Sequence, residues 1–125
     1  MAETRKLALM TASLSQAEQK ALLTFVRQLQ QTYPRRIRQV ALFGSKARGD
    51  SNADSDVDVL IIVDQDDRSF KREIIDIASD LSLEYDVLLS PRVIGEERWK
   101  TNQGFTFYWN IARDALSIPI EPISA

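Results

Sequence analysis

The sequence contains neither cysteine nor histidine, and these two absences remove several kinds of chemistry at once. Without cysteine there can be no disulfides and no thiolate metal sites. Without histidine there can be no imidazole base, no Ser-His-Asp triad and no histidine-ligated zinc. Any catalysis must therefore use carboxylates, hydroxyls, lysine or arginine, and any metal must accept oxygen ligands, as Mg²⁺ and Mn²⁺ do.

A strong excess of charge and long hydrophobic runs are also missing. The 125 residues include 16 basic and 18 acidic ones, which gives a formal net charge of −2. Dedicated nucleic-acid binders usually carry a clear basic excess, so the composition argues against a nucleic-acid partner. No run approaches the ~18 apolar residues of a membrane span, and the start is too short for a signal peptide, so we expect a cytoplasmic protein. The length predicts a single domain over residues 1–125.

Hydrophobic periodicity predicts an α+β domain with a small mixed sheet. Ser15 and Glu18 have the spacing of a capping box, and the helix behind them should stop near Tyr33 because Pro34 follows it. Residues 1–14 show no clear period. The other predicted elements are strands over 39–43, 57–63 and about 85–89, helices over about 69–81, 96–100 and 105–115, and a turn over 50–55.

Seven acidic residues and no basic one lie between residues 50 and 67. Aspartate is a common turn residue, which accounts for the acids at 50, 54, 64, 66 and 67. Asp56 and Asp58 differ, because they open the apolar run 57–63, and alternation places both carboxylates on one face, ~6–7 Å apart along the strand. Like charges there repel each other, whereas a divalent cation between them reverses that repulsion. On this strand alone, a metal site and a chance acidic strand end are equally supported.

A second acid at the start of a predicted strand favours the metal site. Asp86 and the three aliphatic residues after it repeat the pattern that starts at Asp58. If the two strands lie side by side in register, Asp86 joins Asp56 and Asp58, and three carboxylates could hold two Mg²⁺ ions. Asp86 would then also be placed to accept a proton from an attacking hydroxyl. The alternative is an acid at a strand end that pairs with an arginine.

The turn after the first strand has features of a phosphate site. Gly44 would let the backbone approach a phosphate, and the N–H groups that start the following helix would point at it. Ser45 offers a hydroxyl, and Lys46 and Arg48 offer positive charge. The spacing of a P-loop is absent, so this turn is a weak signal when taken alone.

Together these residues read Gly44-Ser45, ten residues, and then Asp56-x-Asp58. This strongly resembles the signature of the DNA polymerase β nucleotidyltransferase superfamily, in the form typical of minimal nucleotidyltransferases. The resemblance implies a palm-like fold in which Gly44 and Ser45 hold the triphosphate of ATP and the two aspartates hold two Mg²⁺ ions. It assigns Asp86 to one metal and to the attacking hydroxyl.

The resemblance also implies a partner and an acceptor. Minimal members are commonly encoded beside a HEPN-domain protein, so the chain is similar to antitoxins that move AMP from ATP onto a tyrosine of a HEPN ribonuclease toxin. One alternative is an antitoxin that only sequesters its toxin by binding, against which three mutually repelling acids argue. Another is a small-molecule nucleotidyltransferase of the aminoglycoside type, for whose second domain 125 residues leave no room.

Two further groups have plain structural interpretations. The arginines at 35, 36 and 38 are predicted to form a solvated face. The aromatic residues near the end of the chain are predicted to be core or partner-interface anchors rather than a base-stacking platform. They are Trp99, Phe105, Phe107, Tyr108 and Trp109.

Overall fold

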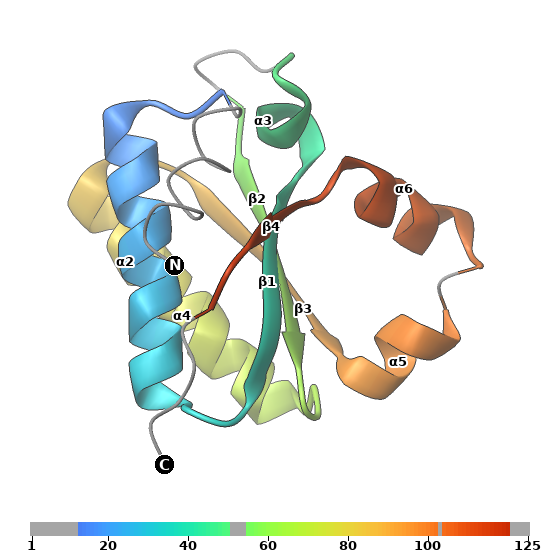
Figure 1. Ribbon diagram of the computed structural model, residues 1–125. Coiled ribbons are helices and arrows are strands. Elements are labelled where there is room, and N and C mark those ends of the chain that lie inside the picture. The colour runs from blue at the N-terminus through green and yellow to red at the C-terminus, as the bar shows by residue number, and fades with distance from the viewer. Residues whose placement is uncertain (1–12, 51–54, 103, 121–125) are drawn as a thin grey trace.

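The computed structural model describes residues 13–50, 55–102 and 104–120, and its helices pack around a four-stranded sheet (Figure 1). In chain order the elements are α2 (Gln16–Thr32), β1 (Ile37–Phe43), α3 (Gly44–Arg48), β2 (Val57–Val63), α4 (Arg68–Tyr85), β3 (Leu89–Gly95), α5 (Glu96–Thr101), α6 (Thr106–Asp114) and β4 (Leu116–Ile118). The strand order is β3-β2-β1-β4, with β2 and β3 parallel and the other neighbours antiparallel. This architecture confirms the predicted α+β class with a small mixed sheet.

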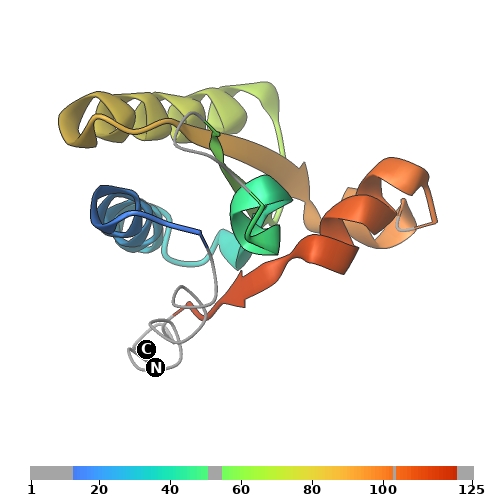
Figure 2. The same ribbon diagram turned by 90° about the horizontal axis from the view of Figure 1, so that it is seen from above.

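The central strand β2 separates two hydrophobic cores because its side chains alternate between the faces of the sheet. The odd-numbered residues from 57 to 63 join the main core, which α2 and α4 cover. Leu60 and Ile62 join a smaller core on the other face, with Ile111 of α6. Figure 2 shows α2 and α4 on one side of the sheet and α5 and α6 on the other. Asp58 shares the face of Leu60 and therefore lies at the edge of the smaller core.

Helix α2 begins and ends where the sequence predicts. The Ser15 hydroxyl accepts a hydrogen bond from the Glu18 N–H (3.1 Å), and the Glu18 carboxylate accepts one from the Ser15 N–H (2.9 Å). These reciprocal bonds form the predicted capping box. The helix ends at Thr32, with Tyr33 as its cap and Pro34 next in the chain.

Most of the other predicted elements are confirmed with small shifts of their ends. β2 has the predicted bounds, β1 begins two residues before the predicted start, and α5 and α6 lie within a residue of theirs. The short β4 was not predicted, and it exists because its backbone pairs with β1, with Ile118 opposite Val40. Residues 51–54 of the predicted turn and residues 1–12 lie outside the described parts of the chain. Across the described ranges, none of the helices has the length and apolar character needed to cross a membrane.

The predicted strand over 85–89 is wrong. Helix α4 continues to Tyr85, and Asp86 caps it with a left-handed backbone (φ 54°). The N–H of Leu89 donates a hydrogen bond to the hydroxyl of Ser82 (3.0 Å), which holds the start of β3 against the last turn of α4. The aliphatic run 87–89, which the sequence pattern assigned to a strand, therefore mostly connects α4 to β3, and β3 starts only at Leu89.

A buried ion pair joins α2 to α3. Lys46 Nζ lies 3.0 Å from Glu18 Oε2, and the two side chains are only 4% and 11% exposed. Glu18 also closes the capping box of α2, and the backbone N–H of Ser13 donates to the carbonyl of Lys46 (2.9 Å). The start of α2 is thus fixed to the helix that follows β1.

We expect Lys46→Met to lower the free energy of unfolding by about 3–5 kcal/mol, because it leaves the Glu18 carboxylate buried without its cation. Urea denaturation measures this loss. The double variant Glu18→Gln/Lys46→Met should recover most of it, because glutamine can still accept the Ser15 N–H without burying a charge. A single variant as stable as the wild type would show that the pair does not hold α3 in place.

Candidate functional site

The turn from β1 into α3 lies directly against Asp58. In the antiparallel pairing, Phe43 at the end of β1 stands opposite Asp58 of β2. Gly44 follows with a left-handed backbone (φ +74°), and a Cβ added to it would collide with Oδ2 of Asp58. Only glycine can therefore occupy this position, and the Gly-Ser turn and the carboxylate form one local unit.

The two predicted carboxylates lie at the start of β2. Asp56 is exposed just before the strand, and Asp58, the second residue of the strand, is half-buried. The pKa of the Asp58 carboxyl is raised from its ordinary value of 3.8, first by burial and then by the charge of Asp56, against the lowering effect of Arg92 and Arg48. The nearby arginines therefore do not neutralise the pair fully.

The donor set at this end of the sheet fits a magnesium ion. Mg²⁺ prefers oxygen ligands and is commonly held by one or two carboxylates together with the phosphates of its substrate. Asp56 and Asp58 supply two carboxylates on one face, and a cation there would remove the repulsion that raises the pKa of Asp58. Within residues 13–50, 55–102 and 104–120, no three acidic side chains are close enough to hold a metal by themselves.

Asp86 does not complete a cluster with this pair. It is exposed at the end of α4, whereas the sequence pattern placed it on a strand in register with Asp58. The register of β2 and β3 puts Ser90 opposite Asp58, and Leu89 opposite Val57. Because β2 and β3 are parallel, Asp86 still precedes β3 at the same end of the sheet at which Asp56 precedes β2.

The two cations of the Gly-Ser turn have carboxylate partners. Lys46 was predicted to face a phosphate, but its ammonium is buried against Glu18, on the α2 side of the turn. Arg48 is exposed and lies 3.1 Å from both Asp50 and Asp114, so that it joins α3 to the end of α6. These contacts fix α3 from two sides. Of the residues predicted for the turn, Gly44 and Ser45 remain beside the acidic pair without such a structural task.

The sequence argument missed Arg92, which acts electrostatically on Asp58. Arg92 lies on β3 opposite Leu60, on the face of the sheet that also carries Asp58. The predicted strand covered about residues 85–89, so Arg92 lay outside it and was assigned to neither face of the sheet. The signal that could have found it is the β-branched pair Val93 and Ile94, which continues the strand beyond Pro91 as far as Gly95.

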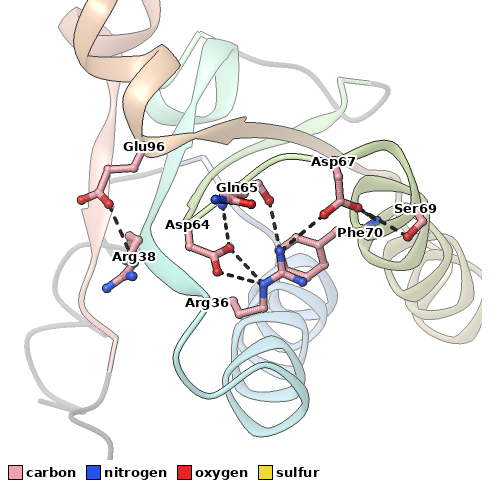
Figure 3. Close-up of polar contacts among 8 residues, drawn as sticks. All are labelled: Arg36, Arg38, Asp64, Gln65, Asp67, Ser69, Phe70 and Glu96. Atoms are coloured by element: carbon pink, nitrogen blue, oxygen red, sulfur yellow. Dashed lines mark hydrogen bonds and ion pairs between the residues drawn. The ribbon is translucent and has the colours of Figure 1, made fainter.

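Three other acids of the cluster, Asp64, Asp66 and Asp67, follow β2 at the opposite end of the sheet, and Figure 3 shows the structural partners of Asp64 and Asp67. Arg36 Nε donates to both oxygens of Asp64 (3.0 and 3.1 Å), and its guanidinium stacks 3.6 Å from the centre of the Phe70 ring. Asp67 caps α4 by accepting the N–H of Phe70 (2.9 Å), and Asp66 forms ion pairs with a lysine of α4 and an arginine of α5. Arg36 is thus part of a structural network and not of a solvated face.

We expect Asp58→Asn to leave the metal-free protein as stable as the wild type or more stable at neutral pH. The folded-state pKa of Asp58 is raised, so the folded protein holds a proton that the unfolded chain has already lost. The cost of holding Asp58 ionised in the folded protein is therefore absent below the pKa that Asp58 has in the unfolded chain. As the pH rises from there to the folded-state pKa of Asp58, this cost appears and the contribution of Asp58 to the free energy of unfolding falls. Carboxyls with lowered pKa values, such as Asp67 and Asp114, act in the opposite sense, so the test is the difference between proteins. Urea denaturation in EDTA from about pH 4 to about pH 7 should show the stability of Asp58→Asn gaining on that of wild type as the pH rises, whereas the control Asp76→Asn should follow the wild type. A variant less stable at every pH would contradict it.

We expect Gly44→Ala to destabilise the fold by at least about 1 kcal/mol, because alanine is strained in the left-handed region and its Cβ meets Asp58. Gly104→Ala is the matched control, since a Cβ there has no neighbour within 4 Å. Thermal denaturation of Gly44→Ala/Asp58→Ala separates the two causes, because the second change relieves the collision and not the backbone strain. Equal melting of both single glycine variants would show that no close approach exists.

Comparison with known proteins agrees with this geometry. Residues 20–116 match the family described as nucleotidyltransferase domain. The chain is 36% identical over 97 residues to MJ0604 of Methanocaldococcus jannaschii, named as a putative protein adenylyltransferase, in a match that covers 78% of this chain and 93% of the relative. It is 51% identical over 65 residues to MJ0141 of the same organism, which carries the same description, covering 51% of this chain and 65% of that relative.

The fold is also similar to that of a solved structure. A crystal structure of a toxin–antitoxin with AMP-PNP superposes with a TM-score of 0.53 at 13% identity, and the match covers 82% of this chain and 73% of the other. At that identity the similarity concerns the fold alone. The family match, by contrast, spans most of the chain and includes the Gly-Ser turn and both strand-borne aspartates. The chain therefore belongs to the nucleotidyltransferase family and is a minimal nucleotidyltransferase.

Proposed function

We propose that this nucleotidyltransferase is a magnesium-dependent protein adenylyltransferase that acts as an antitoxin in the cytoplasm. It would transfer AMP from ATP to a hydroxyl of its partner, a tyrosine of a HEPN ribonuclease toxin, and thereby silence the toxin. The observation that carries the proposal is the pair Asp56 and Asp58 held against the Gly44-Ser45 turn at one end of the sheet.

In the reaction, the acceptor oxygen forms a bond to the α-phosphorus of ATP, the bond from that phosphorus to the bridging oxygen breaks, and pyrophosphate leaves. The protein must therefore bind the metal ions, hold the phosphates and accept the proton of the acceptor hydroxyl. Asp56 and Asp58 would bind two Mg²⁺ ions, which neutralise the phosphate oxygens when bound. Gly44 lets the backbone lie close to the acids, and Ser45 at the start of α3 supplies an N–H and a hydroxyl for a phosphate.

The acceptor proton needs a base, and Asp86 is the proposed one. Its assignment rests on the resemblance to minimal nucleotidyltransferases and on its place at the end of the sheet where β2 and β3 both begin. In the structure Asp86 is exposed at the cap of α4, so that it could reach an acceptor that arrives from solvent. Lys46 is assigned to folding instead of phosphate binding, because its charge is buried with Glu18.

The nature of the acceptor is supported by the relatives. The two proteins of Methanocaldococcus jannaschii are named for adenylyl transfer to proteins, and the structural neighbour is a toxin–antitoxin with an ATP analogue. A toxin hydroxyl is therefore the acceptor we propose, while the HEPN fold of the toxin and the choice of tyrosine come from the family resemblance. A nucleotide site combined with a toxin partner would make this chain an antitoxin that works by modifying the toxin.

A second candidate function is sequestration of the toxin without transfer. It is favoured by the position of Asp86 outside the acidic pair and by the exposed aromatic side chains of α6, which are typical of protein interfaces. Phe105 and Trp109 are 65% and 55% exposed.

A catalytic antitoxin should silence a large molar excess of its toxin, and the toxin should stay silent after the two are separated, because a transferred AMP persists. Toxin activity after titration and intact-mass spectrometry of the toxin measure this. Asp56→Asn and Asp86→Asn should abolish or strongly reduce transfer from labelled ATP while retaining the fold, and Asp76→Asn on α4 should transfer normally. Protection that titrates one to one, survives both site variants and leaves the mass of the toxin unchanged would instead establish sequestration.

A further inference from the structure

Arg92 occupies a position from which a side chain can reach the acidic pair. It lies on β3 opposite Leu60, and Ser90, two residues earlier on the same face, lies opposite Asp58. Diagonal neighbours on adjacent strands are ~7–8 Å apart at their Cα atoms, which a side chain as long as arginine spans. The positive charge of Arg92 accordingly acts to lower the pKa of the Asp58 carboxyl.

The two arginines that act on Asp58 differ in their partners. Arg48 lies 3.1 Å from Asp50 and 3.1 Å from Asp114, so its guanidinium already contacts two carboxylates. Arg92 is exposed, and across the described ranges no carboxylate lies within ion-pair distance of it. An arginine that faces an acidic site from a rigid strand without an ion pair has donors available for another anion.

An aromatic side chain at the start of α6 also contacts Arg92. The guanidinium carbon of Arg92 lies 5.3 Å from the centre of the Phe107 ring, at the start of α6. Phe107 in turn packs edge-on against Tyr108 (5.5 Å between ring centres), which belongs to the smaller core. A guanidinium over a ring keeps its N–H edge turned outward, which is the edge that binds phosphate in a bidentate manner.

We propose that Arg92 binds the β- and γ-phosphates of the nucleotide, the part that leaves as pyrophosphate, and that Phe107 positions its guanidinium for this contact. The inference rests on the proposed function, since it needs a triphosphate bound across Asp58. Among the described cations of the Gly-Ser turn and β3, Lys46 is buried against Glu18 and Arg48 contacts two carboxylates, whereas Arg92 has its N–H groups available for the charge of the leaving group. Arg92 thereby distinguishes a triphosphate from a monophosphate.

Isothermal titration calorimetry tests this with three probes in the presence of Mg²⁺: AMP, pyrophosphate, and α,β-methylene ATP, in which a methylene group replaces the α–β bridging oxygen so that AMP cannot be transferred. We expect Arg92→Gln to weaken the binding of pyrophosphate and of the triphosphate analogue by about tenfold or more, as for the loss of a charged hydrogen bond. The binding of AMP should change by less than about twofold, since AMP lacks these phosphates. Arg92→Lys should recover part of the loss, because it restores the charge without the planar fork.

Two further variants separate positioning from charge. Arg72→Gln on α4 removes the same charge on the far face of the sheet and should bind all three probes like the wild type. Phe107→Leu should weaken the binding of the triphosphate analogue less than Arg92→Gln does. In the transfer assay, Phe107→Leu and Arg92→Gln should each raise the KM for ATP more than they lower kcat.

The outcomes are distinct from those of the proposed function. A wild type that binds neither the triphosphate analogue nor pyrophosphate overturns both proposals. A wild type that binds them, together with an Arg92→Gln variant that binds them equally well, overturns the role of Arg92 and leaves the adenylyltransferase intact. The same holds if Arg92→Gln changes only the KM for the protein acceptor, because Arg92 would then contact the acceptor and not the leaving group.

Discussion

The antiparallel register of β1 and β2 is the constraint on which the site depends. Because Phe43 stands opposite Asp58, the chain that leaves β1 must pass the carboxylate at once, and Gly44 is the only residue type that fits there. At the other end of the same hairpin, Arg36 binds Asp64, and every acid of that turn has a cation or an N–H as its partner. Uncompensated negative charge is thus concentrated at one end of the sheet. Such an arrangement costs stability and is typical of a site that receives a cation.

The two cations that follow the Gly-Ser turn in the sequence, Lys46 and Arg48, hold α3 in place through ion pairs. α3 has only five residues, too few for a helix that is stable alone, so its place depends on tertiary contacts. Lys46 attaches it to α2 through Glu18, and Arg48 attaches it to α6 through Asp114. The Gly-Ser turn is therefore rigid before any nucleotide arrives, which is what precise positioning of a phosphate requires. Arg92 of β3 acts on Asp58 as Arg48 does, but within the described part of the chain it has no carboxylate at ion-pair distance.

One face of the sheet carries the larger hydrophobic core, and the other carries the smaller core and the acidic pair. The larger core under α2 and α4 contains the odd-numbered side chains of β2 and most of the buried apolar residues. On the opposite face the smaller core ends at Leu60, and the acidic pair begins there. Trp99 and Tyr108 pack into that core, as the sequence suggested for the aromatic residues, whereas Phe105 and Trp109 remain largely exposed on α6. The ion pair between Arg48 and Asp114 joins this aromatic helix to α3, next to the Gly-Ser turn.

The sequence by itself determined those features that depend on neighbours in the chain. Ser15 and Glu18 can be recognised as a helix cap because they lie only three positions apart, β2 is recognisable because its apolar run is continuous, and the spacing from Gly44 to Asp58 carries the family signature. Features set by contacts between distant residues could not be found in this way. Lys46 looked like a phosphate ligand until Glu18, 28 residues away, was seen to bury it. Asp86 looked like a strand residue because an acid followed by aliphatics reads the same at a helix cap, and only the packing of α4 against β3 decided between the two. Arg92 gained its place beside Asp58 from the parallel pairing of two strands, and such a register is a property of the folded sheet, because it depends on which residues of each strand are buried together.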